Sequence, residues 1–160
     1  MKNKRIILVG RAASGKDHLR QKLESRGFKY AVSYTTRPPR ATEVNGKDYI
    51  FITTEEAQEM IHKDLFYECV EFNGWIYGTT RKQFKEDDVF IMTPTGISHI
   101  SAEDRASCFI IFLDIAEHVR KLRMLSRDMP GDSVERRIEA DRKDFEDFSD
   151  FDIAITDPNF

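Results

Sequence analysis

The chain has 160 residues, 33% of them charged and 40% hydrophobic, and 25 basic against 28 acidic side chains leave a formal net charge of -3. This length predicts one domain that can bury a core without a metal or disulfide, and the composition excludes a disordered chain and gives no sign of a nucleic-acid surface. No apolar run approaches the roughly 20 residues of a membrane helix, and Ile6 to Val9 is too short a run for a signal peptide. We therefore expect a cytoplasmic protein without a membrane or nucleic-acid partner.

Short apolar runs alternate with helical patterns along most of the chain, which is typical of an α/β fold. Such alternation predicts a parallel sheet flanked by helices. The expected elements, in chain order, are Arg5–Val9, Asp17–Ser25, Asp88–Met92, Cys108–Leu113, Ala116–Arg127, Ser133–Phe148 and Asp152–Ile155.

The segment from Ala31 to Tyr77 has a different pattern, with short strand signals separated by turns. The pairs Asn45-Gly46 and Asn73-Gly74 are typical of tight turns, and Thr53-x-x-Glu56 reads as a capping box at the start of a helix. This segment is predicted to be a small antiparallel insertion within the α/β frame.

The two cysteines, Cys69 and Cys108, stand far apart, and each lies in an apolar, strand-like run. This placement favours two reduced core thiols over a disulfide or a metal site.

A glycine-rich loop, GRAASGKDHL, follows the first predicted strand and fits the pattern GxxxxGK. In such a loop the backbone N–H groups surround phosphate oxygens, a lysine bridges them, and the N-terminus of the next helix adds to the anion site. The loop therefore predicts binding of a nucleotide phosphate, with an ordinary glycine-rich turn as the alternative. The candidate ATP-binding residues are Gly10, Arg11, Ala12, Ala13, Ser14, Gly15, Lys16, Asp17 and His18.

Asp17 stands where a Ser or Thr hydroxyl normally coordinates Mg²⁺ in such loops. A carboxylate there can hold the ion directly or through water, but it also brings negative charge near the β-phosphate. We therefore expect nucleotide affinity to depend steeply on Mg²⁺. The alternative is a loop that binds metal poorly.

Two arginines, Arg37 and Arg40, lie three residues apart in the proline-stiffened segment TTRPPR. Arginine forks match the oxygens of phosphate or carboxylate, and proline fixes the backbone that aims them. The segment can form an anion clamp, with a solvated turn as the alternative.

With this phosphate loop, the segment SYTTRPPRATEVNGKDYIF and the segment FYECVEFNGWIYGT, the chain resembles guanylate kinases closely from about Ile6 to Thr80. Further on, RMLSRD, VERRIEADRKDFE and FDIAITD are similar to the family's lid loop, the helix after it and the final strand. The resemblance implies one domain over residues 1–160. It would comprise a P-loop kinase core at about 1–33 and 81–160, an insertion that binds the nucleoside monophosphate at about 34–80, and a helical lid at about 123–137.

The resemblance also implies roles for matching positions. Glu68 falls where the family reads guanine, whose N1–H and exocyclic amine are adjacent donors that one carboxylate can accept, whereas adenine has no such edge. From strand alternation alone, Glu68 could equally face solvent. The implied GMP-binding residues are Ser33, Arg37, Arg40, Tyr49, Glu68, Tyr77 and Thr79, and the implied catalytic residues are Lys16, Arg37, Arg127 and Arg137, with Arg123 and Arg136 as alternatives for the last two.

The chain departs from the resemblance at two points. Guanylate kinases carry an Asp-x-Asp pair on the strand after the insertion, and Ile91 and Thr93 stand there in this chain. Loss of both carboxylates should slow catalysis or change the acceptor, unless Asp17 restores charge near Mg²⁺. The chain also stops at Phe160, soon after the last predicted strand, so we expect the family's closing helix to be missing.

The resemblance implies an enzyme that transfers the γ-phosphoryl group of ATP to GMP or dGMP, with Mg²⁺ as cofactor. Two alternatives stay open. A guanylate-kinase-like module that binds a nucleotide or a protein without catalysis would explain the missing Asp pair. A ribose 1,5-bisphosphate phosphokinase would explain the Gly-Lys-Asp end of the phosphate loop, although it would leave the guanine-reading residues without a purpose.

Overall fold

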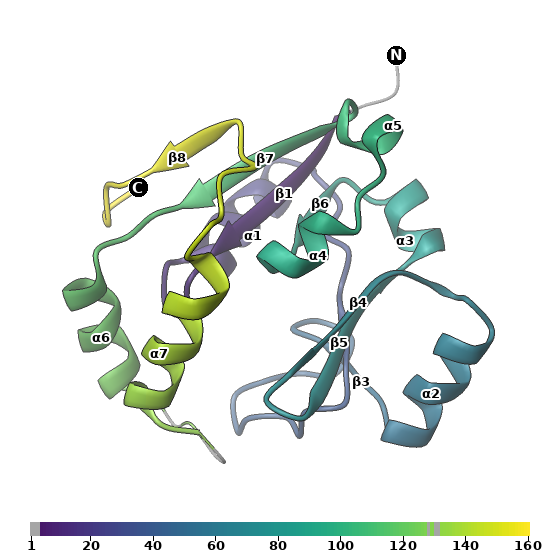
Figure 1. Ribbon diagram of the computed structural model, residues 1–160, viewed down its shortest axis with the longest axis horizontal. Coiled ribbons are helices and arrows are strands. Elements are labelled where there is room, and N and C mark those ends of the chain that lie inside the picture. Colours follow the sequence, from purple (N-terminus) through teal and green to yellow (C-terminus); the bar gives the residue numbers. More distant parts are fainter. Residues whose placement is uncertain (1–3, 128, 130–131) are drawn as a thin grey trace.

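A four-stranded sheet forms the centre of the molecule (Figure 1). The computed structural model describes residues 4–127, 129 and 132–160. All neighbouring strands of this sheet run parallel, which confirms the predicted α/β frame. Across the sheet the order is β6 (Val89–Ile91), β1 (Arg5–Gly10), β7 (Cys108–Leu113) and β8 (Ile153–Ile155).

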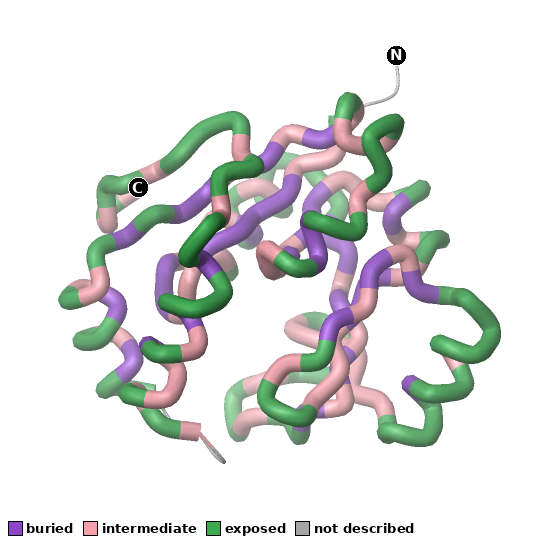
Figure 2. Tube along the Cα trace, viewed as in Figure 1, coloured by how far each residue is buried: buried purple, intermediate pink, exposed green. Residues whose placement is uncertain are grey.

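The core lies on both faces of this sheet, because successive side chains of β1 point to opposite sides. Ile7 and Val9 pack on one side in a cluster that includes Phe145, and Leu8 packs on the other side against Leu19 of α1 (Lys16–Ser25). Buried residues accordingly concentrate along the central strands (Figure 2). The sheet is covered on both faces, as parallel sheets usually are.

The segment between β1 and β6 forms a second sheet, with the order β3 (Ile50–Phe51), β2 (Tyr34–Thr35), β5 (Trp75–Thr80) and β4 (Phe66–Phe72). The main pairings, β4 with β5 and β5 with β2, are antiparallel, and the short strands β2 and β3 run parallel.

Two predicted local signals in this insertion are confirmed. Asn73 and Gly74 both have positive φ values, 53° and 77°, as a tight hairpin turn between β4 and β5 requires. At the start of α2 (Thr54–His62), the Thr53 hydroxyl accepts from the Glu56 N–H at 3.1 Å, and the Glu56 carboxylate accepts from the Thr53 N–H at 3.2 Å.

Helices α6 (Glu117–Leu125) and α7 (Val134–Phe145) lie side by side on the other side of the molecule from the insertion (Figure 1). Both end earlier than the sequence pattern predicts. Beyond α7, Phe148 packs edge-on against Phe112 of β7 at 5.3 Å between ring centres, so the chain turns back to the sheet.

Three short helices between the insertion and β7 were not predicted from the sequence, because they are too short to display a helical period. Each begins at a side chain that caps it: Thr80, Thr93 or Ser101. They are α3 (Arg81–Glu86), α4 (Pro94–Ser98) and α5 (Ala102–Arg105).

Candidate active site

The glycine-rich loop joins the carboxyl end of β1 to the N-terminus of α1. Gly10 has no room for a side chain, because an added Cβ would lie 2.5 Å from the Ser14 Oγ and 3.0 Å from the carbonyl oxygen of Leu113. Gly15 has a φ of 97°, which L-residues rarely adopt, and it directly precedes the helix. The two glycines thus permit a tight turn into a helix N-terminus, where anions are favoured.

The Lys16 ammonium lies over this loop, and its Nζ donates to the carbonyl oxygens of Gly10 and Arg11. Burial is the main cause that lowers the pKa of Lys16 to about 8, and the nearby Arg137 lowers it further. A bound phosphate would favour the charged form of this lysine. The position therefore suits a lysine that bridges phosphate oxygens.

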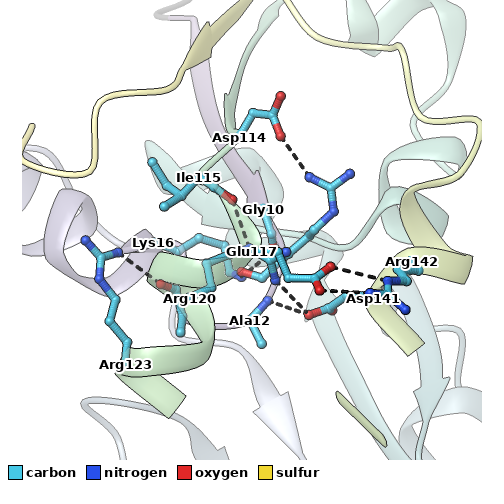
Figure 3. A network of polar contacts seen from close by, with 12 residues as sticks. Gly10, Ala12, Lys16, Asp114, Ile115, Glu117, Arg120, Arg123, Asp141 and Arg142 are labelled. Atoms are coloured by element: carbon cyan, nitrogen blue, oxygen red, sulfur yellow. Dashed lines mark hydrogen bonds and ion pairs between the residues drawn. The ribbon is translucent and has the colours of Figure 1, made fainter. Parts of the chain in front are cut away.

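Helices α6 and α7 support the loop from one side, where both supply polar contacts (Figure 3). Arg123 of α6 donates to the carbonyl oxygen of Ala13 at 3.0 Å, and Asp141 of α7 accepts from the Ala12 N–H at 2.9 Å. Sequence analysis did not single out Asp141. The sequence did offer one signal for Asp141: at helical spacing it shares a face of α7 with the apolar residues Ile138 and Phe145.

Arg37, one of the two predicted clamp arginines, is 6% exposed and is not a solvated turn residue. Its two Nη atoms donate to the two carboxylate oxygens of Glu43, each at 2.9 Å, and Glu43 also accepts from the Arg40 N–H at 2.7 Å. Burial opposes the charged form of Arg37, but the Glu43 carboxylate raises its pKa above the usual value. Sequence analysis missed Glu43, although it lies only six residues after Arg37.

Two tyrosines lie beside this clamp. The guanidinium carbon of Arg37 is 5.3 Å from the centre of the Tyr49 ring, and the rings of Tyr49 and Tyr77 meet edge-on at 6.1 Å. Burial, followed by the neighbouring Tyr77, raises the pKa of Tyr49 to about 12, so its hydroxyl keeps its proton at neutral pH. Both hydroxyls can serve as hydrogen-bond donors.

Glu68 is buried, which rejects the solvent-facing alternative. It shares the inner face of β4 with Phe66 and Val70 and is 5% exposed. Its Oε2 lies against Gly96 of α4, where an added Cβ would come within 2.8 Å. Burial raises the pKa of Glu68 to about 7.

The two predicted hydroxyls near Glu68 are also buried, with Ser33 7% and Thr79 1% exposed. Ser33 lines the same cleft as Glu68. Thr79 pairs with Glu68 across strands β4 and β5 but does not line the cleft, and within the described part of the chain its hydroxyl has no hydrogen-bond partner.

Arg127 and Arg137, from the predicted lid, both line the cleft that contains the phosphate loop. The guanidinium carbon of Arg137 lies 4.3 Å from the centre of the Phe72 ring, near the tip of the β4–β5 hairpin. The alternative arginines are engaged elsewhere, since Arg123 holds the phosphate loop and Arg136 forms an ion pair of 2.6 Å with a neighbouring aspartate. Three residues of the predicted lid lie outside the described residues: Asp128, Pro130 and Gly131.

Positive charge gathers at this end of the cleft. Desolvation, followed by the charge of Arg40, lowers the pKa of Arg127, and Arg137 contributes in the same direction. Together with Lys16 these arginines form a cluster of positive charge, and a bound anion would stabilise their charged forms.

Ile91 and Thr93 lie on the cleft wall where the resemblance predicts carboxylates. The Thr93 hydroxyl accepts from the Gly96 N–H at 3.0 Å and so caps α4. Asp17 extends into solvent with a side chain 76% exposed, 3.2 Å from the Nη2 of the buried Arg20. The described residues contain no group of three or more His, Cys, Asp or Glu side chains arranged to hold a metal.

One cleft of about 300 Å³ connects the phosphate loop, the clamp, Glu68 and the lid arginines. Thr79 and Arg11 are the predicted site residues that do not line it. Arg11 turns instead to Asp114, 2.8 Å away. The predicted residues that line the cleft are Gly10, Ala12, Ala13, Ser14, Gly15, Lys16, Asp17, His18, Ser33, Arg37, Arg40, Tyr49, Glu68, Tyr77, Arg127 and Arg137.

The parallel sheet, the glycine-rich loop at the end of β1 and the charged cleft that faces it define a P-loop nucleotide kinase. No helix in the described part of the chain has the length and apolar character needed to cross a lipid bilayer. Comparison with known proteins gives the family.

The family model for guanylate kinase matches residues 2–160. The chain is 31% identical to a guanylate kinase of Koribacter versatilis (97% of this chain, 72% of that protein) and 32% identical to a human guanylate kinase (94% and 83%). The crystal structure of guanylate kinase from Anaplasma phagocytophilum has the same fold, with a TM-score of 0.73 at 22% identity over 99% of this chain and 81% of that one. The chain belongs to the guanylate kinase family.

Proposed function

We propose that the protein transfers the γ-phosphoryl group of ATP to the phosphate of GMP or dGMP, giving ADP and the nucleoside diphosphate. The observation that carries this proposal is a single cleft that joins the phosphate loop at Lys16 to the buried carboxylate of Glu68. A donor phosphate at the loop and a base at Glu68 would leave the acceptor phosphate between them, beside Arg37 and Arg40.

Base selection is assigned to Glu68. An ionised carboxylate can accept from the N1–H and the exocyclic amine of guanine together, and these two charge-assisted bonds would offset the cost of its burial. Adenine would present no matching pair of donors and would leave the carboxylate unpaired. Ser33 and Thr79 are proposed to contribute hydroxyls near the guanine O6, and of the two Ser33 lines the cleft.

The acceptor phosphate is assigned to four side chains. Arg37 and Arg40 would offset its negative charge, while Tyr49 and Tyr77 would donate hydrogen bonds and fix its orientation. The buried ion pair of Arg37 with Glu43 supports this assignment, because it holds the guanidinium in place before the substrate arrives.

Phosphoryl transfer between these groups requires alignment and charge stabilisation more than acid–base chemistry. The acceptor phosphate is already ionised at neutral pH, so no general base is needed. Lys16, Arg127 and Arg137 are proposed to offset the charge that spreads over the oxygens of the transferred group.

We propose that the cleft closes when the insertion and the lid move toward the core, following the domain division proposed from the sequence. The core at about 1–33 and 81–160 would carry the donor site, the insertion at about 34–80 the acceptor, and the lid at about 123–137 the transfer arginines. Contact between Arg137 and Phe72 supports such closure, because it joins α7 to the insertion hairpin. Closure would exclude water and prevent futile hydrolysis of ATP.

Mg²⁺ fits this cleft as an ion carried by the nucleotide. Magnesium typically keeps several waters and binds one or two carboxylates together with substrate phosphates, and Asp17 at the exposed start of α1 can act as that carboxylate, directly or through water. When bound, the ion would neutralise phosphate charge.

The test is ADP release from ATP and Mg²⁺ with GMP, dGMP, AMP, CMP, UMP and ribose 1,5-bisphosphate as separate acceptors. We expect turnover with guanine nucleotides alone. The Glu68→Gln variant should lose about 100-fold in kcat/KM for GMP, because the Gln side chain keeps only one acceptor oxygen and places an NH2 donor against the second guanine donor in a buried site. The matched control is Glu71→Gln, which removes an exposed carboxylate from the same strand and should leave the rate unchanged.

Two results would contradict the proposal. Turnover of ribose 1,5-bisphosphate in preference to GMP would make the protein a sugar-phosphate kinase. GMP binding without turnover of any acceptor would make it a binding module.

A further inference from the structure

Asp141 is a buried carboxylate to which the proposed reaction assigns no task. It lies on α7, is 4% exposed and lines the cleft beside the phosphate loop. Its Oδ2 accepts from the Ala12 N–H at 2.9 Å (Figure 3). Burying a carboxylate is costly unless it is well partnered, so the identity of its partners indicates what it does.

Arg120 of α6 forms an ion pair with this carboxylate, but in the described part of the chain it makes no hydrogen bond to it. Its Nη1 lies 3.6 Å from the Asp141 Oδ2, which is longer than a hydrogen bond, and that atom has no hydrogen-bond partner among the described residues. Its Nε donates to the carbonyl oxygen of Ile115 instead. The short contact of Asp141 is therefore the one to the phosphate loop.

The bonded amide lies in the first half of that loop. Ala12 comes before Ala13 and Gly15, the two residues with positive φ that turn the chain into α1. The bond therefore holds the part of the loop that precedes Ala13. The amides at the N-terminus of α1 stay available to a phosphate.

Arg137 lies one helical turn before Asp141, and residues four apart share a helix face. Ile138, between them, belongs to the buried apolar cluster that also contains Ala13 of the loop and Met124 of α6. Burial is the main cause that lowers the pKa of Lys16, Arg137 lowers it further and Asp141 raises it, so both residues of α7 lie within electrostatic reach of this lysine. Helix α7 thus carries Asp141, which binds the loop, and Arg137, which lines the cleft together with Lys16.

We propose that Asp141 is a positioning residue: by binding the Ala12 N–H it holds α7 against the phosphate loop and sets Arg137 beside the phosphates that Lys16 binds. This inference rests on the proposed function, since it supposes that Arg137 acts on the transferred group. In this role Asp141 links the phosphate loop to α7 and does not contact the substrate.

The first test compares Asp141→Ala with Asp141→Asn. Without an acceptor for the Ala12 N–H, Asp141→Ala should lower kcat by about 10- to 100-fold through misplacement of Arg137, while the Kd for GMP stays within about twofold. Asp141→Asn keeps an acceptor oxygen and should remain within about threefold of the parent. The control is Glu139→Ala, which removes a carboxylate, 78% exposed, from the same helix.

Parental kcat in Asp141→Ala would overturn the proposal, and so would equal losses in the Ala and Asn variants, because the charge and not the acceptor would then matter. Asp141→Ala also removes the carboxylate that forms an ion pair with the buried Arg120, which can unfold the protein. The comparison is therefore repeated in an Arg120→Met background, where that cation is absent.

A double-mutant cycle with Arg137→Ala separates positioning from a structural role. If Asp141 acts through Arg137, adding Asp141→Ala to Arg137→Ala should cause little further loss of kcat. Multiplicative losses would overturn the proposal.

A measurement without turnover keeps this inference distinct from the proposed function. Hydrogen exchange of the Ala12 amide in the ADP complex should be slow in the parent and in Asp141→Asn, and at least about tenfold faster in Asp141→Ala. Inactivity of the parent toward GMP would refute the proposed function, whereas unchanged exchange in Asp141→Ala would refute the bond on which the inference depends.

Discussion

Arg37, which lines the cleft, forms a bidentate ion pair with Glu43, and each of its Nη atoms lies 2.9 Å from a carboxylate oxygen. The carboxylate also binds the Arg40 N–H, so one acidic side chain organises both arginines of the clamp. An arginine fork that is fixed in advance loses less conformational freedom when it binds a phosphate.

Removing this carboxylate should weaken acceptor binding. We expect Glu43→Ala to raise the KM for GMP about tenfold, equivalent to ~1.4 kcal/mol, while the KM for ATP is unchanged, because Arg37 would lose its orientation. Steady-state kinetics with each nucleotide varied in turn measures both values, and Glu55→Ala on the exposed face of α2 serves as the control. Tighter GMP binding in Glu43→Ala would mean that Glu43 competes with the phosphate instead.

The affinity for GMP should depend on the protonation of Glu68. Burial raises the pKa of Glu68 to about 7, and the ionised form is the one that can accept from both guanine donors. GMP binding should therefore weaken as pH falls from about 8 to about 6, by up to tenfold per pH unit below the pKa. Calorimetric titration at several pH values measures the Kd for GMP. The Glu68→Gln variant shows how much of the pH dependence comes from titration of the GMP phosphate itself. Parallel pH profiles for parent and variant would contradict this assignment.

The same carboxyl should reduce the stability of the folded protein at high pH. Its pKa is raised from 4.5 to about 7 on folding, so the folded state binds the proton more tightly. The favourable contribution is present below the unfolded pKa and is lost as pH rises through the folded pKa. We expect Glu68→Gln to be more stable than the parent by up to ~3 kcal/mol near pH 8, with a smaller difference near pH 5. Urea unfolding at several pH values measures this, with Glu71→Gln as the control. A Glu68→Gln variant less stable than the parent at pH 8 would count against it.

Asp17 is expected to support catalysis through Mg²⁺. Its side chain is exposed at the first turn of α1, and Asp17→Ser should lower kcat about tenfold and change the dependence of the rate on Mg²⁺ concentration. The fold should survive, since Arg20 keeps its 2.7 Å ion pair with Glu24. Glu24→Gln is the control for an effect through Arg20. An Asp17→Ser variant as fast as the parent would show that this carboxylate does not compensate for Ile91 and Thr93.

Much of the fold could be predicted because its signals are contained in short stretches of sequence. The run Cys108–Leu113 is apolar throughout, as a strand of a covered parallel sheet must be, and Thr53 and Glu56 carry a complete capping box. Helices such as α4 could not be predicted in this way, since five residues are too few for a period to appear. Likewise, strand alternation alone left both faces of β4 open for Glu68.

By itself, the sequence determined that an α/β frame carries a phosphate loop, because the strand, the two glycines, Lys16 and the following helix are consecutive and need no distant partner. Only the tertiary structure decided that Glu68 is buried, which of the lid arginines line the cleft, and that Asp141 binds the loop. These outcomes depend on contacts between residues far apart in the chain, such as Ala12 and Asp141, which are 129 positions apart. Such contacts leave no local pattern, since the energy of a buried charge is set by the groups that the folded chain brings around it.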